Sequence, residues 1–275
     1  MSEIFKAAVV QVSSNARISN NLTQCRKWIE AAREKGAKLI GLPENFSFMG
    51  SEEEKKNLIG QIEIETKSFL SETAKDLGIF LLGGGYPTEV GNGKVFNTAS
   101  LFSPDGLEIF KYNKAHLFNA EVGDGVKYQE SRSTESGGKL PEVISTEIGN
   151  LSSAICYDVR FPELFRNLSK NGCEICFLPA AFTVPTGAAH WDILLRARAI
   201  ENLMYILAPG QTGSHDPHGK RKTYGHSMII SPWGEILVDA GTEVGYAIAE
   251  IDLDQLKETR KNFPALHHSL FLSKT

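Results

Sequence analysis

Short apolar runs alternate with amphipathic segments along the whole chain, and this alternation constrains the fold more than any other feature. Residues 7–12 are typical of a buried strand, and residues 21–35 carry apolar side chains at helical spacing until Gly36 ends the pattern. The same reasoning predicts strands at residues 39–42, 79–82, 95–101, 107–112, 151–155, 175–178, 205–208, 227–230, 236–238 and 246–251, and helices at residues 66–77, 163–170, 191–202 and 253–263. Such a pattern is typical of the α/β class, so we expect one domain over residues 1–275 with a mixed sheet between helices.

Two polar segments interrupt this alternation. Residues 113–140 form a long and irregular stretch, and such a stretch marks a functional loop more often than a scaffold connection. Residues 213–222 form a second loop, which is polar and basic. The last three strands, between residues 227 and 251, are expected to close the fold as an antiparallel meander.

The composition excludes several classes of partner. The chain has 29 Lys and Arg against 33 Asp and Glu, and this balance lacks the basic stripe of a nucleic-acid-binding protein. No apolar run approaches the ~20 residues that cross a bilayer, and the first residues lack the pattern of a secretory leader. The four cysteines are too few for a disulfide scaffold. We therefore expect a cytoplasmic protein without a membrane or nucleic-acid partner.

Cys173 and Cys176 have the spacing of a redox or zinc motif. Such a motif needs a helix start or a second ligand pair, and neither is present in the sequence around them. Because the segment between them is typical of a strand, residues three apart face opposite sides. We expect both cysteines to be structural and no metal to be bound.

Cys156 lies at a corner where a reactive side chain can be held. The apolar run at residues 151–155 predicts a strand, and Pro162 opens a helical segment soon after it. A corner between a strand and a helix presents its side chain at the rim of the sheet, beside backbone N–H groups. A thiol there can serve as a nucleophile, whereas a free cysteine elsewhere is usually a small buried apolar residue. This segment alone leaves both interpretations open.

Glu44, Lys114 and Glu130 also lie at strand ends or in the loops beyond them, where α/β proteins place their functional residues. Each has an ordinary explanation by itself: Glu44 as a helix cap, Lys114 as a solvated strand edge, and Glu130 as a surface carboxylate. Their combination with Cys156 is what indicates a catalytic site.

Three segments that contain these residues occur in a specific order: 41–44 (Gly-Leu-Pro-Glu), 111–117 (Lys-Tyr-Asn-Lys-Ala-His-Leu) and 156–163 (Cys-Tyr-Asp-Val-Arg-Phe-Pro-Glu). As a set they resemble the nitrilase superfamily of carbon–nitrogen hydrolases, whose signature is a Glu-Lys-Cys triad. The resemblance extends from about Phe5 to the final helix. It implies a four-layer αββα sandwich with mixed β-sheets between helices, in subunits that pair into a homodimer.

The resemblance further implies an amidase that requires no metal or organic cofactor. Cys156 is expected to attack the amide carbonyl carbon and form a thioester, while Glu44 moves the proton. Lys114 and the backbone N–H of Tyr157 are expected to stabilise the oxyanion. Glu130 matches an additional glutamate of the family, which orients the lysine and the substrate amide.

The region after the cysteine resembles the Nit-type branch of the superfamily, through segments 177–187, 195–202 and 224–228. Substrates of that branch are amides of small 2-oxo acids, and the resemblance favours deaminated glutathione. The alternative is omega-amidase activity on α-ketoglutaramate or α-ketosuccinamate. Nitrile hydrolysis and a catalytically idle binding protein are the more remote alternatives.

Arg160 is the candidate for binding a substrate carboxylate, because a planar guanidinium can donate two parallel hydrogen bonds to it. The structural alternative is an ion pair with Glu163 or Asp158. By resemblance, Phe182 and Thr186 join Arg160 and the neighbouring tyrosine in binding the substrate, although an aromatic residue after a strand is usually core.

Residues 220–222 form a second cationic group. A charged run on a loop is normally only solvated, but deaminated glutathione has a distal glycine carboxylate that needs a partner. We expect Lys220 and the two residues after it to help hold that end. The segment 209–211 departs from the pattern of the family and is expected to reshape the pocket wall. Trp191 is expected either at a subunit interface or in the core.

Overall fold

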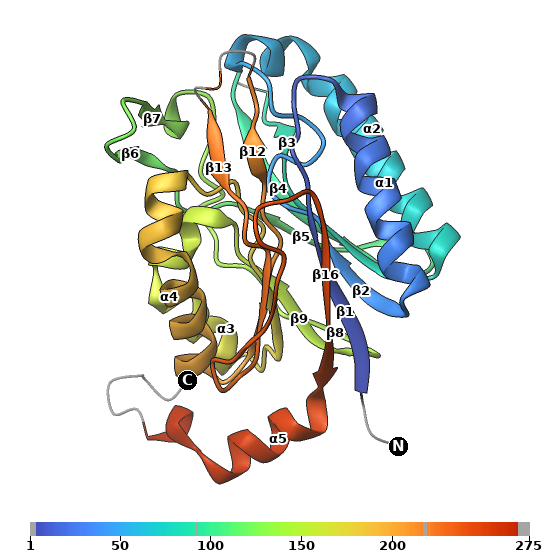
Figure 1. The fold of residues 1–275 in the computed structure, drawn as a ribbon, viewed down its shortest axis with the longest axis vertical. Coiled ribbons are helices and arrows are strands. Elements are labelled where there is room, and N and C mark those ends of the chain that lie inside the picture. Colours follow the sequence, from blue (N-terminus) through green and yellow to red (C-terminus); the bar gives the residue numbers. More distant parts are fainter. Residues whose placement is uncertain (1–3, 92, 217–218, 220, 269–275) are drawn as a thin grey trace.

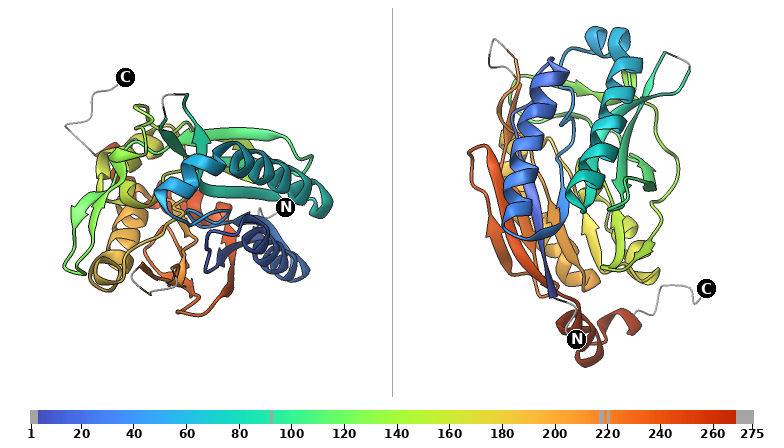
Figure 2. Two further views of the ribbon diagram at one scale, coloured as in Figure 1. Left: turned by 90° about the horizontal axis from the view of Figure 1, so that it is seen from above. Right: turned by 90° about the vertical axis from the view of Figure 1, so that its right-hand side faces the viewer.

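Two six-stranded sheets pack face to face, and a pair of helices covers the outer face of each sheet (Figure 1 and Figure 2). The computed structural model describes residues 4–91, 93–216, 219 and 221–268. The helices are α1 (Ile18–Glu34), α2 (Glu52–Leu77), α3 (Pro162–Lys170), α4 (Val184–Asn202) and α5 (Leu253–Asn262), with 3₁₀ turns η1 (Glu130–Arg132), η2 (Cys156–Arg160) and η3 (Ala265–His267). The α/β class and the αββα layering are therefore confirmed.

The first sheet is mixed and has the strand order β16-β1-β2-β3-β4-β5. Its strands are β1 (Ile4–Gln11), β2 (Ala37–Gly41), β3 (Phe80–Glu89), β4 (Val95–Phe102), β5 (Glu108–Asn113) and β16 (Gly245–Asp252). Strands β1, β2 and β3 are parallel, and the other pairs are antiparallel. Alternate side chains of β1 face opposite layers: Ala7 and Val9 join the core between the sheets, whereas Ala8 and Val10 pack towards α1 and α2.

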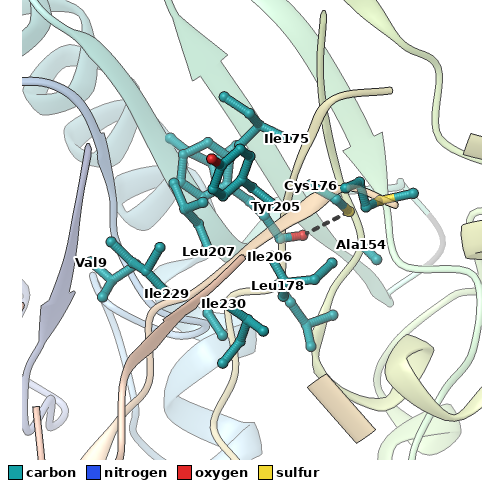
Figure 3. Packing of buried hydrophobic residues seen from close by; sticks show 14 of the residues in the cluster. Val9, Ala154, Ile175, Cys176, Leu178, Tyr205, Ile206, Leu207, Ile229 and Ile230 are labelled. Atoms are coloured by element: carbon teal, nitrogen blue, oxygen red, sulfur yellow. Dashed lines mark hydrogen bonds between the residues drawn. The ribbon is translucent and has the colours of Figure 1, made fainter. Parts of the chain in front are cut away.

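The second sheet has the order β15-β14-β11-β10-β9-β8 and is parallel only at its centre. Its strands are β8 (Ile144–Thr146), β9 (Gly149–Ser153), β10 (Ile175–Phe177), β11 (Tyr205–Ala208), β14 (Met228–Ile230) and β15 (Ile236–Asp239). Figure 3 shows Val9 of the first sheet beside Leu207 and Ile229 of the second, in the core that the two inner faces share. Because the two sheets cover each other within one chain, their burial requires no second subunit.

Both polar segments predicted as irregular loops contain a short hairpin. Strand β6 (Asn119–Glu121) pairs with β7 (Lys127–Gln129), which leads into η1, and β12 (Thr212–Ser214) pairs with β13 (Lys222–Tyr224). Strands of three mainly polar residues carry no apolar alternation, so the sequence pattern did not reveal them. In Figure 1 both hairpins lie at the same end of the molecule as the start of α2.

The predicted closing meander is wrong in its last strand. Strands β14 and β15 pair as expected, but β16 leaves the second sheet and pairs antiparallel with β1 along eight positions, from Ile4 with Asp252 to Gln11 with Gly245. The alternation within a strand shows which side chains face the core. It does not show which of two nearby sheets offers a free edge.

Two helices begin earlier than predicted. Helix α2 begins at Glu52 rather than at residue 66, because the side chains of Ser51 and Glu54 cap its first turn reciprocally. Helix α4 begins at Val184 rather than at residue 191, with Pro185 in its first turn. None of the helices in the described ranges is both long and apolar enough to cross a bilayer.

Trp191 belongs to the core. Its side chain is 1% exposed, its ring centroid lies 4.7 Å from that of Phe182, and its Nε1–H donates to the carbonyl of His226 at 2.8 Å. The expectation that Trp191 lies at a subunit interface is therefore wrong, because the helix turns this side chain inward. Cys173 and Cys176 are likewise buried, and both are free thiols.

Candidate active site

The predicted triad residues meet where strands of both sheets end. Glu44 follows β2 and Lys114 follows β5 in the first sheet, whereas Cys156 follows β9 in the second. Glu130 reaches the same place from η1, beyond the β6–β7 hairpin. The structure thus brings together four residues that are spread over more than a hundred positions of the chain.

Cys156 is held in an unusual backbone conformation. Its φ is +47°, in the left-handed region that costs a residue with a Cβ atom on the order of 1 kcal/mol or more. The Cys156 N–H donates to the carbonyl of Pro179 at 2.9 Å, and the N–H of Ile155 donates to the Asp158 carboxylate at 2.9 Å. These contacts fix the corner. The Tyr157 N–H lies at the N-terminal end of η2, where amide donors have no partner within the turn.

Asp158 joins this corner to the lysine segment. Its fully buried carboxylate accepts from the Tyr112 hydroxyl at 2.9 Å and from the backbone N–H of His116 at 3.1 Å. The Nδ1 atom of His116 lies 2.7 Å from the same carboxylate, and its ring stacks on Phe161 with centroids 3.6 Å apart. Asp158 is therefore engaged by the lysine segment and does not form an ion pair with Arg160, which was one of the two structural alternatives for that arginine.

Lys114 lies between two carboxylates. Its Nζ is 3.0 Å from Oε1 of Glu44, and it is 3.1 Å and 3.0 Å from the two carboxylate oxygens of Glu130. The second oxygen of Glu44 accepts from the N–H of Ala181 at 2.8 Å, and that of Glu130 accepts from the N–H of Phe118 at 2.7 Å. Both carboxylates are thus oriented from two sides, and the ammonium is fixed between them.

Asn97 completes this network, and the sequence analysis missed it. Its side-chain Nδ2 donates to Glu44 at 2.8 Å and to Glu130 at 3.3 Å, and its backbone carbonyl accepts from the backbone N–H of Lys114 at 2.9 Å. The available signal was a polar side chain in the apolar strand β4. Such a residue is also common at a sheet surface, so the sequence does not separate the two cases.

Glycines allow β3 to approach the glutamate closely. A Cβ atom on Gly84 would lie 2.3 Å from the carbonyl oxygen of Leu42, and one on Gly85 would lie 2.7 Å from Cγ of Glu44. The N–H of Asn45 donates to the carbonyl of Gly85 at 2.6 Å. The close contact with β3 therefore fixes the backbone on both sides of Glu44.

The segment 209–211 supports the same backbone from the other side. Gln211 is buried, and its Nε2 donates to the carbonyl of Glu44 at 3.1 Å and to the Ser14 hydroxyl at 2.8 Å. The carbonyl of Pro209 accepts from the N–H of Ala180. The segment 209–211 thus lies behind the glutamate and is not part of the cavity lining described below, which it was expected to reshape.

The triad residues set one another's ionisation. Burial raises the pKa of Glu44, but the charge and hydrogen bond of Lys114, the Cys156 thiol and the Asn97 amide together hold it below its ordinary value. Burial lowers the pKa of Lys114, but Glu130 and Glu44 outweigh it and raise this pKa well above the ordinary value. Burial, followed by the charge of Glu44, raises the pKa of Cys156 well above its ordinary value. At neutral pH the site therefore holds a carboxylate, an ammonium and a neutral thiol.

These residues form the floor of a cavity of about 530 Å³, a size suited to a small organic ligand. Its lining includes Glu44, Asn97, Lys114, Glu130 and Cys156, which we call the floor, and Lys55, Lys127, Arg132, Arg221 and Lys222, which we call the wall. Lys220 of the predicted cationic group lies outside the described residues. No group of three or more His, Cys, Asp or Glu side chains in the described ranges is arranged to hold a metal ion.

The predicted substrate-binding residues form a group beside Cys156 rather than part of this lining. The guanidinium carbon of Arg160 lies 5.9 Å from the ring centroid of Tyr157 and 5.5 Å from that of Phe182. The Oγ1 of Thr186 lies 2.7 Å from that of Thr183, which does line the cavity. Arg160 thus lies beside two aromatic rings. Thr186 does not line the cavity itself but contacts Thr183, which does.

The family model for carbon-nitrogen hydrolases matches residues 6–261. A deaminated glutathione amidase of Synechocystis sp. (strain PCC 6803 / GT-S) is 47% identical over 98% of this chain and 99% of its own length. Omega-amidase NIT2 of Xenopus tropicalis is 37% identical over 94% of this chain and 93% of its own. The crystal structure of the C. elegans NitFhit protein superimposes with a TM-score of 0.91 at 37% identity, and the match covers 97% of this chain and 65% of that longer chain.

Proposed function

The chain belongs to the carbon-nitrogen hydrolase family, and we propose that it is a cysteine-dependent amidase for small 2-oxo acid amides. The observation that carries this proposal is the Lys114 ammonium, held between the carboxylates of Glu44 and Glu130 on the floor of a cavity that Cys156 also lines. The similarity to a deaminated glutathione amidase supports deaminated glutathione as the substrate.

In the first half of the reaction, the Cys156 sulfur attacks the amide carbonyl carbon. Its proton passes to Glu44, which is a carboxylate at neutral pH because Lys114 lowers its pKa. As the C–S bond forms, the carbonyl oxygen gains negative charge and is stabilised by the Lys114 ammonium and the Tyr157 N–H. The C–N bond then breaks, Glu44 returns the proton to the departing nitrogen, and a thioester remains.

In the second half, water attacks the thioester carbonyl carbon. Glu44 accepts a proton from this water, the Lys114 ammonium and the Tyr157 N–H stabilise the second oxyanion, and the C–S bond breaks. Glu44 then returns the proton to the Cys156 sulfur, so each turnover consumes one water and releases one acid and one amine. Glu130 does not exchange protons in this scheme. It orients Lys114, to which it presents both carboxylate oxygens.

The 2-oxo acid end of the substrate is assigned to the group around Arg160. Its guanidinium can bind a carboxylate through two hydrogen bonds, and the rings of Tyr157 and Phe182 flank it. Thr186 contacts the hydroxyl of Thr183, the residue after Phe182, and so lies between this group and the cavity lining. The proximity of Arg160 to Cys156 along η2 supports this assignment.

Omega-amidase activity on α-ketoglutaramate is the second candidate, and the 37% identity to an omega-amidase supports it. The two candidates differ in the leaving group, which is cysteinylglycine in one and ammonia in the other.

Steady-state rates on four compounds test the proposal: deaminated glutathione, α-ketoglutaramate, α-ketosuccinamate and an aryl nitrile. We expect the highest kcat/KM on deaminated glutathione. A higher value on either simple amide would assign an omega-amidase, and a comparable rate on the nitrile would assign a nitrilase. If the wild-type protein turned over none of them, a binding protein that kept the fold would be the conclusion.

We further propose that residues 1–275 act as one catalytic domain in a cytoplasmic homodimer. The exposed apolar side chains Ile193 and Ile200 lie seven positions apart on α4, and the exposed rings of Trp233 and Phe263 pack together with centroids 5.7 Å apart. Exposed apolar groups of this kind support a protein interface. Light scattering on the purified protein is expected to give twice the mass of one chain, and the mass of one chain would contradict the dimer.

A further inference from the structure

The wall of the cavity above the triad is cationic. Its positive side chains come from three separate places: Lys55 from the first turn of α2, Lys127 and Arg132 from β7 and η1, and Arg221 and Lys222 from the β12–β13 hairpin. Apart from the triad network, Glu52 is the carboxylate that the described lining contains. Such a concave wall attracts anions.

Two of these cations already have carboxylate partners. The Nζ of Lys55 lies 2.9 Å from Glu52, and that of Lys127 lies 3.2 Å from Glu121. For Arg132, Arg221 and Lys222, the described part of the chain shows no ion pair within 4.0 Å. Arg221 nevertheless lies close enough to Glu52 for its charge to help lower the pKa of that carboxyl. The lining therefore has an excess of positive charge, to which Arg132 and Lys222 contribute without an ion pair in the described part of the chain.

The backbone beneath two of these cations is anchored. His215, in the loop of the same hairpin, is buried, and its ring nitrogens lie 2.8 Å from the carbonyl of Ser14 and 2.7 Å from the hydroxyl of Thr223. Arg221 is half-buried, and its Nη1 reaches the carbonyl of Gly50 at 3.4 Å. The hairpin is thus tied to the segment between β1 and α1 and to the residues just before α2, and these contacts hold the backbone that carries its cations.

We propose that Arg132, Arg221 and Lys222 bind the carboxylate of the amine that leaves, and so select substrates whose leaving group is an anionic peptide. This inference rests on the proposed amidase function. The reacting carbonyl is fixed at Cys156, and the acid end of the substrate is assigned to Arg160, outside the cavity lining. The amine end therefore extends into the cavity, whose lining contains these three cations.

The chemistry of this wall fits a terminal carboxylate. Two guanidinium groups can each donate paired hydrogen bonds to it, and an ammonium adds charge without a fixed direction. Cysteinylglycine, the amine released from deaminated glutathione, ends in such a carboxylate, whereas ammonia from α-ketoglutaramate cannot reach the wall. The wall thus discriminates between the two candidate substrates by the charge of the leaving group.

The test compares the double variant Arg221→Gln/Lys222→Gln with the wild-type protein on three substrates. These are deaminated glutathione, its analogue with a carboxamide in place of the glycine carboxylate, and α-ketoglutaramate. We expect the ratio of kcat/KM for deaminated glutathione to that for α-ketoglutaramate to fall by about 10-fold to 100-fold, through KM. The ratio of kcat/KM for the carboxamide analogue to that for α-ketoglutaramate is expected to change by less than about twofold. Arg132→Gln is expected to act in the same direction.

The matched control is Lys75→Gln/Lys170→Gln, which removes two exposed charges away from the cavity and is expected to leave the ratio unchanged. An equal loss on all three substrates, or an unchanged ratio in the cavity variant, would overturn the proposal.

A binding measurement separates this inference from the proposed function. In the Cys156→Ala background, calorimetry is expected to show that deaminated glutathione binds about 10-fold more tightly than its carboxamide analogue. Equal affinities would overturn the inference even if the wild-type protein were an active amidase. Tight, carboxylate-dependent binding by a wild-type protein that hydrolyses none of the amides would support the wall and contradict the amidase.

Discussion

The floor and the wall of the cavity are built in opposite ways. On the floor, Glu44 and Lys114 are buried at the ends of sheet strands, and every carboxylate oxygen of Glu44 and Glu130 accepts a hydrogen bond. On the wall, Arg132 and Lys222 are exposed side chains that extend from a 3₁₀ turn and a three-residue strand.

This difference separates what each region can do. The floor is preorganised, because its charges are fixed by neighbours that are themselves packed in strands, and such fixed dipoles stabilise a transition state without rearrangement. The wall carries part of its charge on exposed side chains that water screens, so it suits the recognition of a distant part of the substrate. We therefore expect changes on the floor to act mainly on kcat and changes on the wall mainly on KM.

The largest effect is expected from the nucleophile. Cys156→Ala removes the atom that forms the thioester, so kcat should fall by about 10⁴-fold or more, measured by product release from deaminated glutathione. Cys173→Ala removes a thiol that is also buried but lies outside the cavity, and it is expected to keep activity within about fivefold. Activity retained by Cys156→Ala would contradict the mechanism.

Asn97 tests whether the network on the floor positions the triad. Asn97→Ala should lower kcat by about 10-fold to 100-fold, since the two carboxylates lose a shared donor. Because this amide helps to lower the pKa of Glu44, its loss should also move the acid limb of the pH–rate profile to higher pH.

Asn262→Ala, at an exposed helix end, is the control for Asn97 and should change neither kcat nor the pH profile. A purely structural role would lower the unfolding temperature of Asn97→Ala and leave the acid limb where it is in the wild-type protein.

His215 tests the anchoring of the wall. Burial lowers its pKa from 6.5 to about 4, so between these values the unfolded chain binds a proton that the folded protein does not. The free energy of unfolding should therefore decrease as the pH falls from about 6.5 towards about 4, by up to about 3 kcal/mol from this group.

Urea unfolding of the wild-type protein and of His215→Asn, at several pH values in this window, measures that contribution. The variant should be less stable at neutral pH and should show a shallower dependence on pH. The exposed His267, replaced by Gln, is the control and should keep the wild-type slope. Equal slopes in the wild-type protein and His215→Asn would contradict the assignment.

The smallest effect is expected from salt, which separates wall from floor without a mutation. Between about 0.01 M and about 1 M salt the Debye length falls from about 30 Å to about 3 Å, so exposed charges are screened far more than buried ones. The KM for deaminated glutathione should rise by about fivefold, while kcat changes by less than about twofold. A salt effect on kcat alone would contradict the division between floor and wall.

Much of the fold was predictable because core strands and amphipathic helices carry regular apolar patterns. The strand at Tyr205–Ala208 was predicted with its observed bounds, and the helix that ends at Leu77 was predicted from the glycine after it. The first half of that helix was missed because its turns are mostly charged. Ile62 is its buried side chain, so it shows no apolar period, and its start depends on the cap at Ser51. The two hairpins of the cavity wall were missed because three polar residues have no recognisable period.

The candidate site divides in the same way. Glu44, Lys114 and Cys156 were identified from motifs that follow strand ends, where side chains of this type are exposed to a common space. Asn97 was not identified, because its role depends on contacts with distant parts of the chain. Its side-chain amide donates to Glu44 and Glu130, and its backbone carbonyl accepts from Lys114. Asp158 was considered only as a partner for Arg160, whereas the folded chain gives its carboxylate to Tyr112 and the lysine segment.

The sequence by itself determined the residue types at the strand ends, the alternation that builds two layers of helices around sheets, and the family to which the chain belongs. Only the tertiary structure decided that β16 pairs with β1, that Asn97 joins two glutamates, and that Arg132 faces the same cavity as Arg221. The physical reason is that local patterns report the burial of each residue. Pairing between distant segments is instead selected by the packing of the whole chain, because many edges and partners satisfy the same local pattern.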